Sequence, residues 1–162
     1  MEENNIEINR SSRHNKITGD FAESLILYWL SKHNFECVNV DHTGIDIIAK
    51  NPKTKELIGI SVKGRDRIEG REKSSLTIGI DHLDKVKIAC KAFNCIPYFA
   101  FVIDESKNHK IYCFILSMQE LLKIFPKNSK TLNWKMDEKN LKNYYKNQKI
   151  KIFEFDYKTF SW

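Results

Sequence analysis

The chain is poor in the residues that mark metal-bound, exported or membrane-spanning proteins. Its four cysteines, among 162 residues, show neither a CxxC motif nor the Cys/His spacing of a zinc site. No apolar run approaches the length of a membrane span, so we expect no transmembrane segment and no membrane partner. The N-terminal stretch MEENNIEINRSSRHNK is polar and lacks the apolar centre of an export signal. These absences predict a reduced, cytoplasmic protein.

Internal repeats, low-complexity tracts, obvious linkers and helix-turn-helix signatures are also missing. A length of 162 residues suffices for one packed core but not for two, so we expect a single domain over 1–162. We divide it into a core at about 17–117 and a lysine-rich C-terminal extension over 118–162. That extension holds ten lysines against five acids, and therefore +5 of the net charge of +6. Such a surface attracts polyanions, but it is equally typical of a solvated face.

Hydrophobic periodicity predicts alternating helices and strands. A helix begins near Thr18 as N-cap in TGDFAESLILYWLSKHN, and a second spans IDHLDKVKIACKAFN. Between them lie three predicted strands, FECVNV, IDIIAK (45–50) and LIGISVK, followed by the charged stretch GRDRIEGREKSS, which we expect to be an exposed loop. The strands PYFAFVID and KIYCFILS, a short helix MQELLKIF, and a less regular tail complete the chain.

An acid and a lysine stand in neighbouring strands that are otherwise apolar, within GIDIIAKNPKTKELIGISVKGR. Alternate residues of a strand face the same side, so Ser61 and Lys63 share one face. A short turn joins the strands, which therefore pair antiparallel and bring Asp46 within about one or two rungs of both residues. The first helix adds Glu23 on the side that meets the core. Such charges are costly to bury unless they pair, bind a metal or do chemistry.

The order of these elements resembles the core of the PD-(D/E)XK nuclease superfamily. More narrowly, GIDIIA followed by ISVKGR is similar to Mrr-type restriction endonucleases and archaeal Holliday-junction resolvases, over roughly residues 17–105. The resemblance implies a restriction-endonuclease-like α/β fold, with a mixed central β-sheet flanked by helices in an αβββαβ core. It also implies a divalent-metal-dependent endonuclease that hydrolyses phosphodiester bonds in DNA, in preference to RNA, and uses Mg²⁺ or Mn²⁺. Many enzymes of this type work as dimers, so a homodimer is one expected state.

The resemblance also implies roles for individual residues. Asp46 matches the metal-binding aspartate, and Lys63 matches the lysine that orients the attacking water and stabilises the pentavalent phosphate. Glu23 matches the helical acid of resolvase-like members, and Val62 would offer its backbone carbonyl to the metal. A hard cation on such oxygen ligands polarises the phosphate, and the lysine supplies positive charge where negative charge develops.

Ser61 departs from the family pattern, which usually has Glu, Asp or Gln at this position. A hydroxyl can serve as an auxiliary ligand, but it removes one negative charge and should weaken Mg²⁺ binding. Glu23 could take the place of the missing acid, and Asp41 or Asp20 are further candidates. If none of them reaches the metal, the fold is kept and catalysis is lost.

Contacts with DNA are expected from the basic loop that follows Lys63 and from the lysines of 118–162. The loop residues concerned are Arg65, Arg67, Arg71 and Lys73. His42 is either a ligand or base, or an ordinary loop histidine. Three aromatic residues among the lysines could stack on bases, although we expect them to pack in a core or interface: Trp134, Tyr144 and Tyr145.

Two alternatives to the nuclease stay open. The first is a catalytically inactive nuclease-fold protein that acts as a nucleic-acid-binding or complex-forming subunit, which the serine at position 61 favours. The second is a protein-interaction domain in which Asp46 and Lys63 form a structural ion pair.

Overall fold

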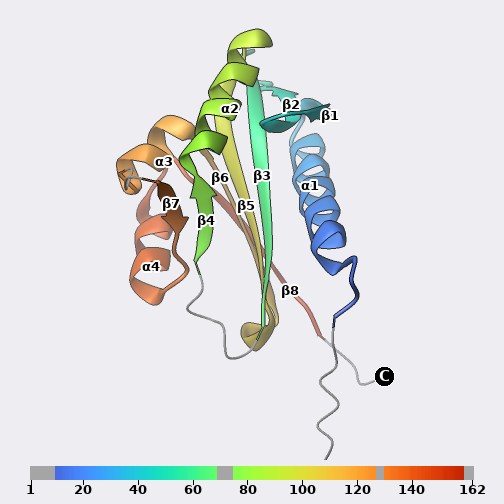
Figure 1. Cartoon of the computed structure of the whole chain (residues 1–162), viewed down its shortest axis with the longest axis vertical. Coiled ribbons are helices and arrows are strands. Elements are labelled where there is room, and N and C mark those ends of the chain that lie inside the picture. Colours follow the sequence, from blue (N-terminus) through green and yellow to red (C-terminus); the bar gives the residue numbers. More distant parts are fainter. Residues whose placement is uncertain (1–9, 69–74, 127–129, 159–162) are drawn as a thin grey trace, which may run out of the picture.

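The computed structural model describes residues 10–68, 75–126 and 130–158, and Figure 1 shows the whole chain. The elements run α1 (His14–Lys32), β1 (Glu36–His42), β2 (Ile45–Lys50), β3 (Leu57–Arg67), β4 (Leu76–Gly79), α2 (Ile80–Ala92), β5 (Ile96–Glu105), the 3-10 turn η1 (Ser106–Asn108), β6 (Lys110–Ser117), α3 (Met118–Ile124), β7 (Thr131–Trp134), α4 (Glu138–Lys146) and β8 (Lys151–Asp156). The predicted alternation of helices and strands is confirmed.

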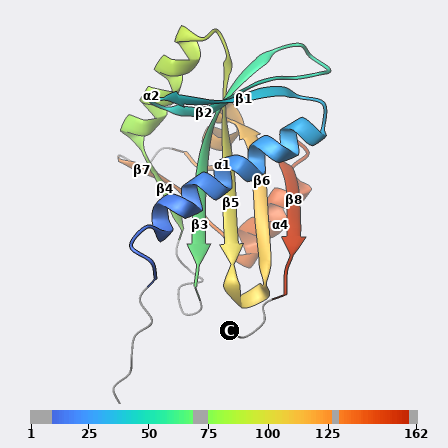
Figure 2. The same ribbon diagram turned by 90° about the vertical axis from the view of Figure 1, so that its right-hand side faces the viewer.

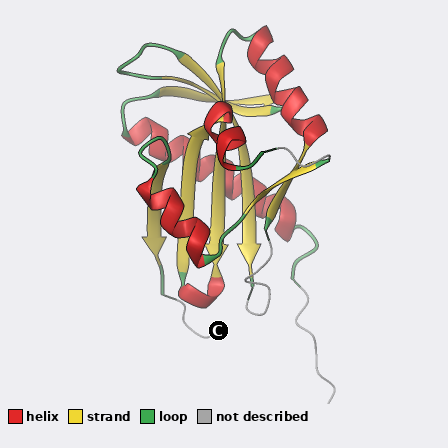
Figure 3. Cartoon of the chain, turned by 90° about the vertical axis from the view of Figure 1, so that its left-hand side faces the viewer, coloured by secondary structure: helices red, strands yellow, loops and turns green. Residues whose placement is uncertain are grey.

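A six-stranded mixed sheet in the order β1-β2-β3-β5-β6-β8 forms the centre of the protein. Strands β3 and β5 are parallel, and the other neighbours are antiparallel. Helix α1 crosses one face of this sheet (Figure 2). Helices α2, α3 and α4 lie on the opposite face (Figure 3), together with the two-stranded β4–β7 sheet. Within the described ranges, no helix is both long and apolar enough to cross a membrane.

Each face of the sheet has its own hydrophobic core. Under α1, the helix residues Ala22, Ile26 and Leu30 pack on the strand residues Ile60 and Val62. The opposite core is larger, and most of its members come from β5, β6, α2 and the C-terminal segment: Leu83, Val86, Ala89, Phe99, Phe101, Phe114, Trp134 and Tyr144 are among them. A sheet covered on both sides needs apolar residues at successive strand positions, as β3 and β5 have.

Two local predictions are wrong at their boundaries. Helix α1 begins four residues before Thr18, and the Thr18 hydroxyl donates a hydrogen bond to the His14 carbonyl one turn earlier, at 2.8 Å. Strand β3 continues into the first four residues of the stretch expected to be an exposed loop, 64–75, and ends at Arg67, while residues 69–74 of that stretch lie outside the described residues. The reason is its parallel pairing with β5, which runs on to the pair Arg67↔Glu105.

The described parts of the segment 118–162 pack with the main sheet and its larger core. Strand β8 pairs with β6 at the edge of the main sheet. Trp134 and Tyr144 are 0% and 1% exposed and lie in the larger core, which confirms the packing role expected for them. Tyr145, in contrast, is exposed and donates a hydrogen bond to Glu154.

The residue directly before β2 is a glycine, and we expect its replacement to destabilise the fold. Gly44 has φ +103, and a Cβ there would lie 2.6 Å from the Lys85 carbonyl oxygen of α2. Gly44→Ala combines backbone strain with a collision against a helix, so we expect a loss of about 2 kcal/mol or more in the free energy of unfolding, measured by urea titration.

The matched control is Gly19→Ala. Gly19 lies inside α1, and a Cβ there meets nothing within 4 Å. Alanine favours a helix over glycine, so this variant should gain about 0.5–1 kcal/mol. Equal effects at the two positions would contradict the account of Gly44.

Candidate active site

Asp46 lies where β2 separates from β3. The antiparallel ladder runs from Lys50↔Leu57 to Ile47↔Ile60, and Asp46 is the next residue, opposite Ser61. Its Oδ2 accepts a hydrogen bond from the backbone N–H of Val62 at 2.7 Å. The carboxylate therefore satisfies a backbone donor of β3 just beyond the end of the ladder. The convergence expected of these strands is confirmed.

The backbone carbonyl of Val62 faces the same gap. In a strand, the N–H and C=O of one residue point toward the same neighbouring strand. Because the Val62 N–H points to Asp46, its carbonyl oxygen is directed to the β2 side as well. This places a second oxygen beside the separation of the two strands.

Helix α1 brings Glu23 to the same region. The helix crosses β3 at Gly64, where a Cβ would lie 2.8 Å from the Cβ of Ala22, the residue before Glu23. Burial raises the pKa of Glu23, and the negative charge of Asp46 raises it further. Burial likewise raises the pKa of Asp46, against the opposing effects of the Val62 hydrogen bond and of Lys63. The Glu23 carboxylate is therefore held within the unfavourable field of Asp46.

Lys63 is the cation of this group. Burial lowers its pKa, while the charges of Asp46 and Glu23 oppose that change. All three residues therefore sense one another electrostatically, although they come from three different elements. A lysine in such an environment is a point of positive charge that water screens poorly.

Oxygen donors around Asp46 fit a divalent cation of open coordination. Within the residues that the structure describes, no three His, Cys, Asp or Glu side chains gather closely enough to hold a metal alone. Mg²⁺, however, commonly uses one or two carboxylates and takes its other ligands from water and substrate phosphates. The repulsion between Asp46 and Glu23 is what such a cation would relieve. Asp46, Glu23 and the Val62 carbonyl would hold it.

Ser61 does not face this gap as a free hydroxyl. It is 0% exposed, and its Oγ lies 2.8 Å from Nε2 of His82, in the first turn of α2. As an auxiliary metal ligand it would have to leave this partner. Sequence reasoning missed His82 because it is distant in sequence and because the rotation of a helix about its axis sets its direction. The available sequence signal was the position of His82 near the start of the first helix predicted after Val62 and Lys63.

The other candidate acids lie outside this group. Asp20 is 62% exposed and forms an ion pair with Lys16 at 2.8 Å. Asp41 and His42 are exposed on β1, and the His42 ring packs edge-on against Phe93.

The four expected DNA contacts have different positions. Arg65 is exposed, on the same face of β3 as Lys63. Arg67 is buried, at 3% exposure, and its Nη1 lies 3.3 Å from Glu105 Oε2, so it is corrected from a surface contact to a core ion pair. Arg71 and Lys73 lie outside the described residues.

A polar cleft of about 460 Å³ opens beside the end of this site, between α1 and β3. Its lining includes Arg10, His14, Gly64, Arg65 and Asp66. Arg10 and His14 both contact Asp66 at 2.9 Å, which ties the start of the described chain to β3. The cleft therefore combines one partly neutralised acid with two arginines.

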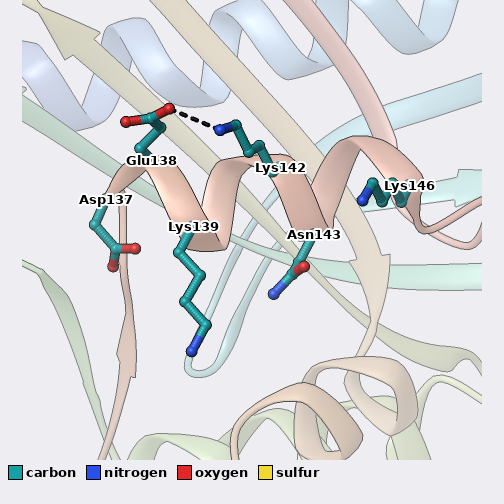
Figure 4. Close-up of a pocket in the computed structure, with 6 residues that line it drawn as sticks. All are labelled: Asp137, Glu138, Lys139, Lys142, Asn143 and Lys146. Atoms are coloured by element: carbon teal, nitrogen blue, oxygen red, sulfur yellow. Dashed lines mark ion pairs between the residues drawn. The ribbon is translucent and has the colours of Figure 1, made fainter.

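A second hollow lies along the outer face of α4 (Figure 4). Three lysines line it, Lys139, Lys142 and Lys146. Lys142 pairs with Glu138 at 2.8 Å, whereas Lys139 and Asn143 extend from the opposite side of the helix in the close-up. This is an exposed basic helix face on the side of the sheet that also carries α2.

The architecture is that of a restriction-endonuclease-like α/β fold, as the sequence predicted. This chain is similar in structure to Hjc, a Holliday junction resolvase of Archaeoglobus fulgidus, with a TM-score of 0.53 and 18% identity over 75% of this chain and 85% of that one. Neither a protein-family model nor a curated protein sequence matches the chain. The likeness supports the fold, and the site residues rest on the geometry given above.

Proposed function

We propose that the protein is a divalent-metal-dependent endonuclease acting on DNA. The observation that carries the proposal is the Asp46 carboxylate, held at the separation of β2 and β3 beside Glu23 and Lys63. Two acids and one lysine, brought together from α1, β2 and β3, are groups that support metal-dependent phosphodiester hydrolysis. The similarity to a Holliday junction resolvase supports branched DNA as the first substrate to examine.

Each residue has a distinct part in this proposal. Asp46, Glu23 and the Val62 carbonyl hold a Mg²⁺ or Mn²⁺ ion, which supplies Lewis-acid polarisation of the phosphate when bound. Lys63 orients the attacking water and offsets the negative charge that develops on the phosphate oxygens. Because burial limits screening around Lys63, its charge acts more strongly there than on the surface.

Binding of the DNA backbone is assigned to surfaces beyond the reacting atoms. Arg65 and the lysines of α4 are exposed cations that can contact phosphates without reading sequence. A homodimer, which would allow two strands to be cut, stays a prediction.

The first experiment is cleavage of plasmid, single-stranded and four-way branched DNA with Mn²⁺ or Mg²⁺, alongside chelator controls. We expect metal-dependent cleavage by the wild type. Replacement of Lys63 by an uncharged residue of similar length, Lys63→Met, should slow cleavage about a hundredfold or more while DNA binding changes little.

The matched control is Lys53→Met, which removes a lysine from the exposed turn between β2 and β3. It should cleave at the wild-type rate. Cleavage by Lys63→Met at the rate of this control would remove Lys63 from the mechanism.

A second candidate function is favoured by the burial of Ser61. Where the family usually places an acid, this chain has a hydroxyl closed off by His82, so catalysis could be absent from an intact fold. The protein would then bind nucleic acid as a non-catalytic subunit. That function predicts salt-sensitive binding without a metal requirement, and no cleavage of any DNA in the panel.

A further inference from the structure

The contact between Ser61 and His82 determines the orientation and the tautomer of the imidazole ring. A buried hydroxyl needs an acceptor for its proton, and Nε2 of His82 at 2.8 Å is the partner found for it within the described ranges. If the Ser61 hydroxyl donates to Nε2, the ring proton resides on Nδ1. The half-buried ring then has an N–H donor on the side of the ring that does not face Ser61.

His82 lies next to the proposed catalytic lysine. Ser61 and Lys63 are on one face of β3, and α2 covers that face. Burial lowers the pKa of His82 to about 4, and the charges of Lys63 and Lys85 contribute to that change. The imidazole is therefore neutral at pH 7, and the opposing charge of Asp81 does not offset the effects of burial and of the two lysines.

We infer that His82 contacts the scissile phosphate of DNA through Nδ1–H, on the α2 side of Lys63, with Ser61 as the positioning residue that fixes its ring. This inference rests on the proposed function, because it concerns the substrate of the same site. Ser61 has no exposed surface and cannot reach a substrate, whereas the residue that covers it can. The serine that departs from the nuclease pattern thus orients a hydrogen-bond donor, the Nδ1–H of His82.

Imidazole ¹⁵N NMR tests the contact independently of cleavage. The chain has five histidines, so a histidine-labelled protein gives a resolvable set of ring signals. The probe is a four-way junction of short oligonucleotides, added at low salt with EDTA. We expect the ring signals that vanish in His82→Gln to shift as the junction is added, while those of His33, exposed at the end of α1, stay in place.

Junction binding that leaves the His82 signals unmoved would overturn the inference, as would the absence of any junction binding. If His82 responds but the wild type cleaves nothing, the nuclease proposal fails, and the contact of His82 with bound DNA stands without a part in cleavage. The two proposals can therefore fail separately.

Single-turnover cleavage is the second arm. His82→Ala should slow cleavage about ten- to hundredfold, the value of one hydrogen bond to a charged group, with the junction Kd changed less than about threefold. His33→Gln should leave both unchanged. Ser61→Ala should also slow cleavage and should broaden or shift the His82 ring signals, because the ring loses its anchor. A His82→Ala variant that cleaves like the wild type would overturn the assignment.

Discussion

Asp46→Asn should lower the rate of DNA cleavage about a thousandfold or more, because one lost metal-binding carboxylate removes several kcal/mol of charge stabilisation. The side chains of Asn and Asp have nearly the same shape, and the amide oxygen can still accept the Val62 N–H bond. The variant therefore keeps the contact that joins β2 to β3 and removes only the charge. Cleavage is measured on branched DNA with Mn²⁺ and with Mg²⁺.

The same variant should be at least as stable as the wild type when metal is chelated. The pKa of Asp46 is raised in the folded state, mainly by burial, so the folded protein holds this proton more tightly than the unfolded chain. Its ionisation therefore destabilises the fold as the pH rises through the interval between the ordinary and the raised pKa, and the penalty is complete above it. At neutral pH, Asp46→Asn should raise the Tm by about 2–4 °C, which corresponds to about 1 kcal/mol. At a pH below the ordinary carboxylate pKa the difference should disappear.

Asp84→Asn is the control, since Asp84 is an exposed acid of α2 that makes only a long ion pair, 4.0 Å, with Lys87. It should change neither cleavage nor Tm. Wild-type cleavage by Asp46→Asn would disprove the nuclease mechanism. A marked loss of stability would instead favour a structural ion pair with Lys63.

Local rules were sufficient to predict the meeting of Asp46 with Ser61 and Lys63. A short turn between two strands fixes antiparallel pairing, and alternation along a strand fixes the side on which each residue lies. Both rules act over a few residues, so the sequence pattern contains the information. The observed register, Ile47↔Ile60, confirms the outcome.

Distant pairing explains what the sequence did not reveal. The parallel contact of β3 with β5 extends β3 to Arg67, and only this contact turns an expected surface arginine into a buried partner of Glu105. His82 is similar, because its contact with Ser61 depends on how α2 is placed on the sheet. Sequence patterns predict that polar and charged residues are exposed. Contacts between distant segments bury them instead where these contacts supply a partner, as they do for Arg67 and His82.

The lysine content of residues 118–162 predicts exposed faces but not where the segment packs. The lysines mark the exposed faces, as along α4, but a few aromatic residues determine where the segment packs. Trp134 stacks between Phe101 and Tyr144, with ring centroids 4.4 Å and 4.1 Å away. One of these partners belongs to the central strand β5 and the other to α4, so this indole joins the C-terminal segment to the main sheet.

Trp134→Ala should therefore lower the free energy of unfolding by about 3–5 kcal/mol, the cost of deleting a large buried aromatic side chain. That is a large share of the roughly 5–15 kcal/mol that stabilises a typical domain. The cavity would lie between Phe101, Tyr144 and the neighbouring ring of Phe114, so the sheet and α4 should lose order together. Urea titration followed by near-UV and far-UV circular dichroism measures both the loss and its cooperativity.

Trp134→Phe separates the ring from its polar atom. The indole Nε1 is buried without a hydrogen-bond partner within the described ranges, so the native side chain carries a desolvation penalty that phenylalanine lacks. We expect Trp134→Phe to cost about 1–2 kcal/mol less than Trp134→Ala, since it keeps the stacking and removes the unsatisfied donor. Tyr28→Ala, at a side chain 57% exposed on α1, should cost little. If Trp134→Ala has the same urea midpoint of unfolding as the wild type, the ring contacts of Trp134 do not stabilise the fold, and the prediction is wrong.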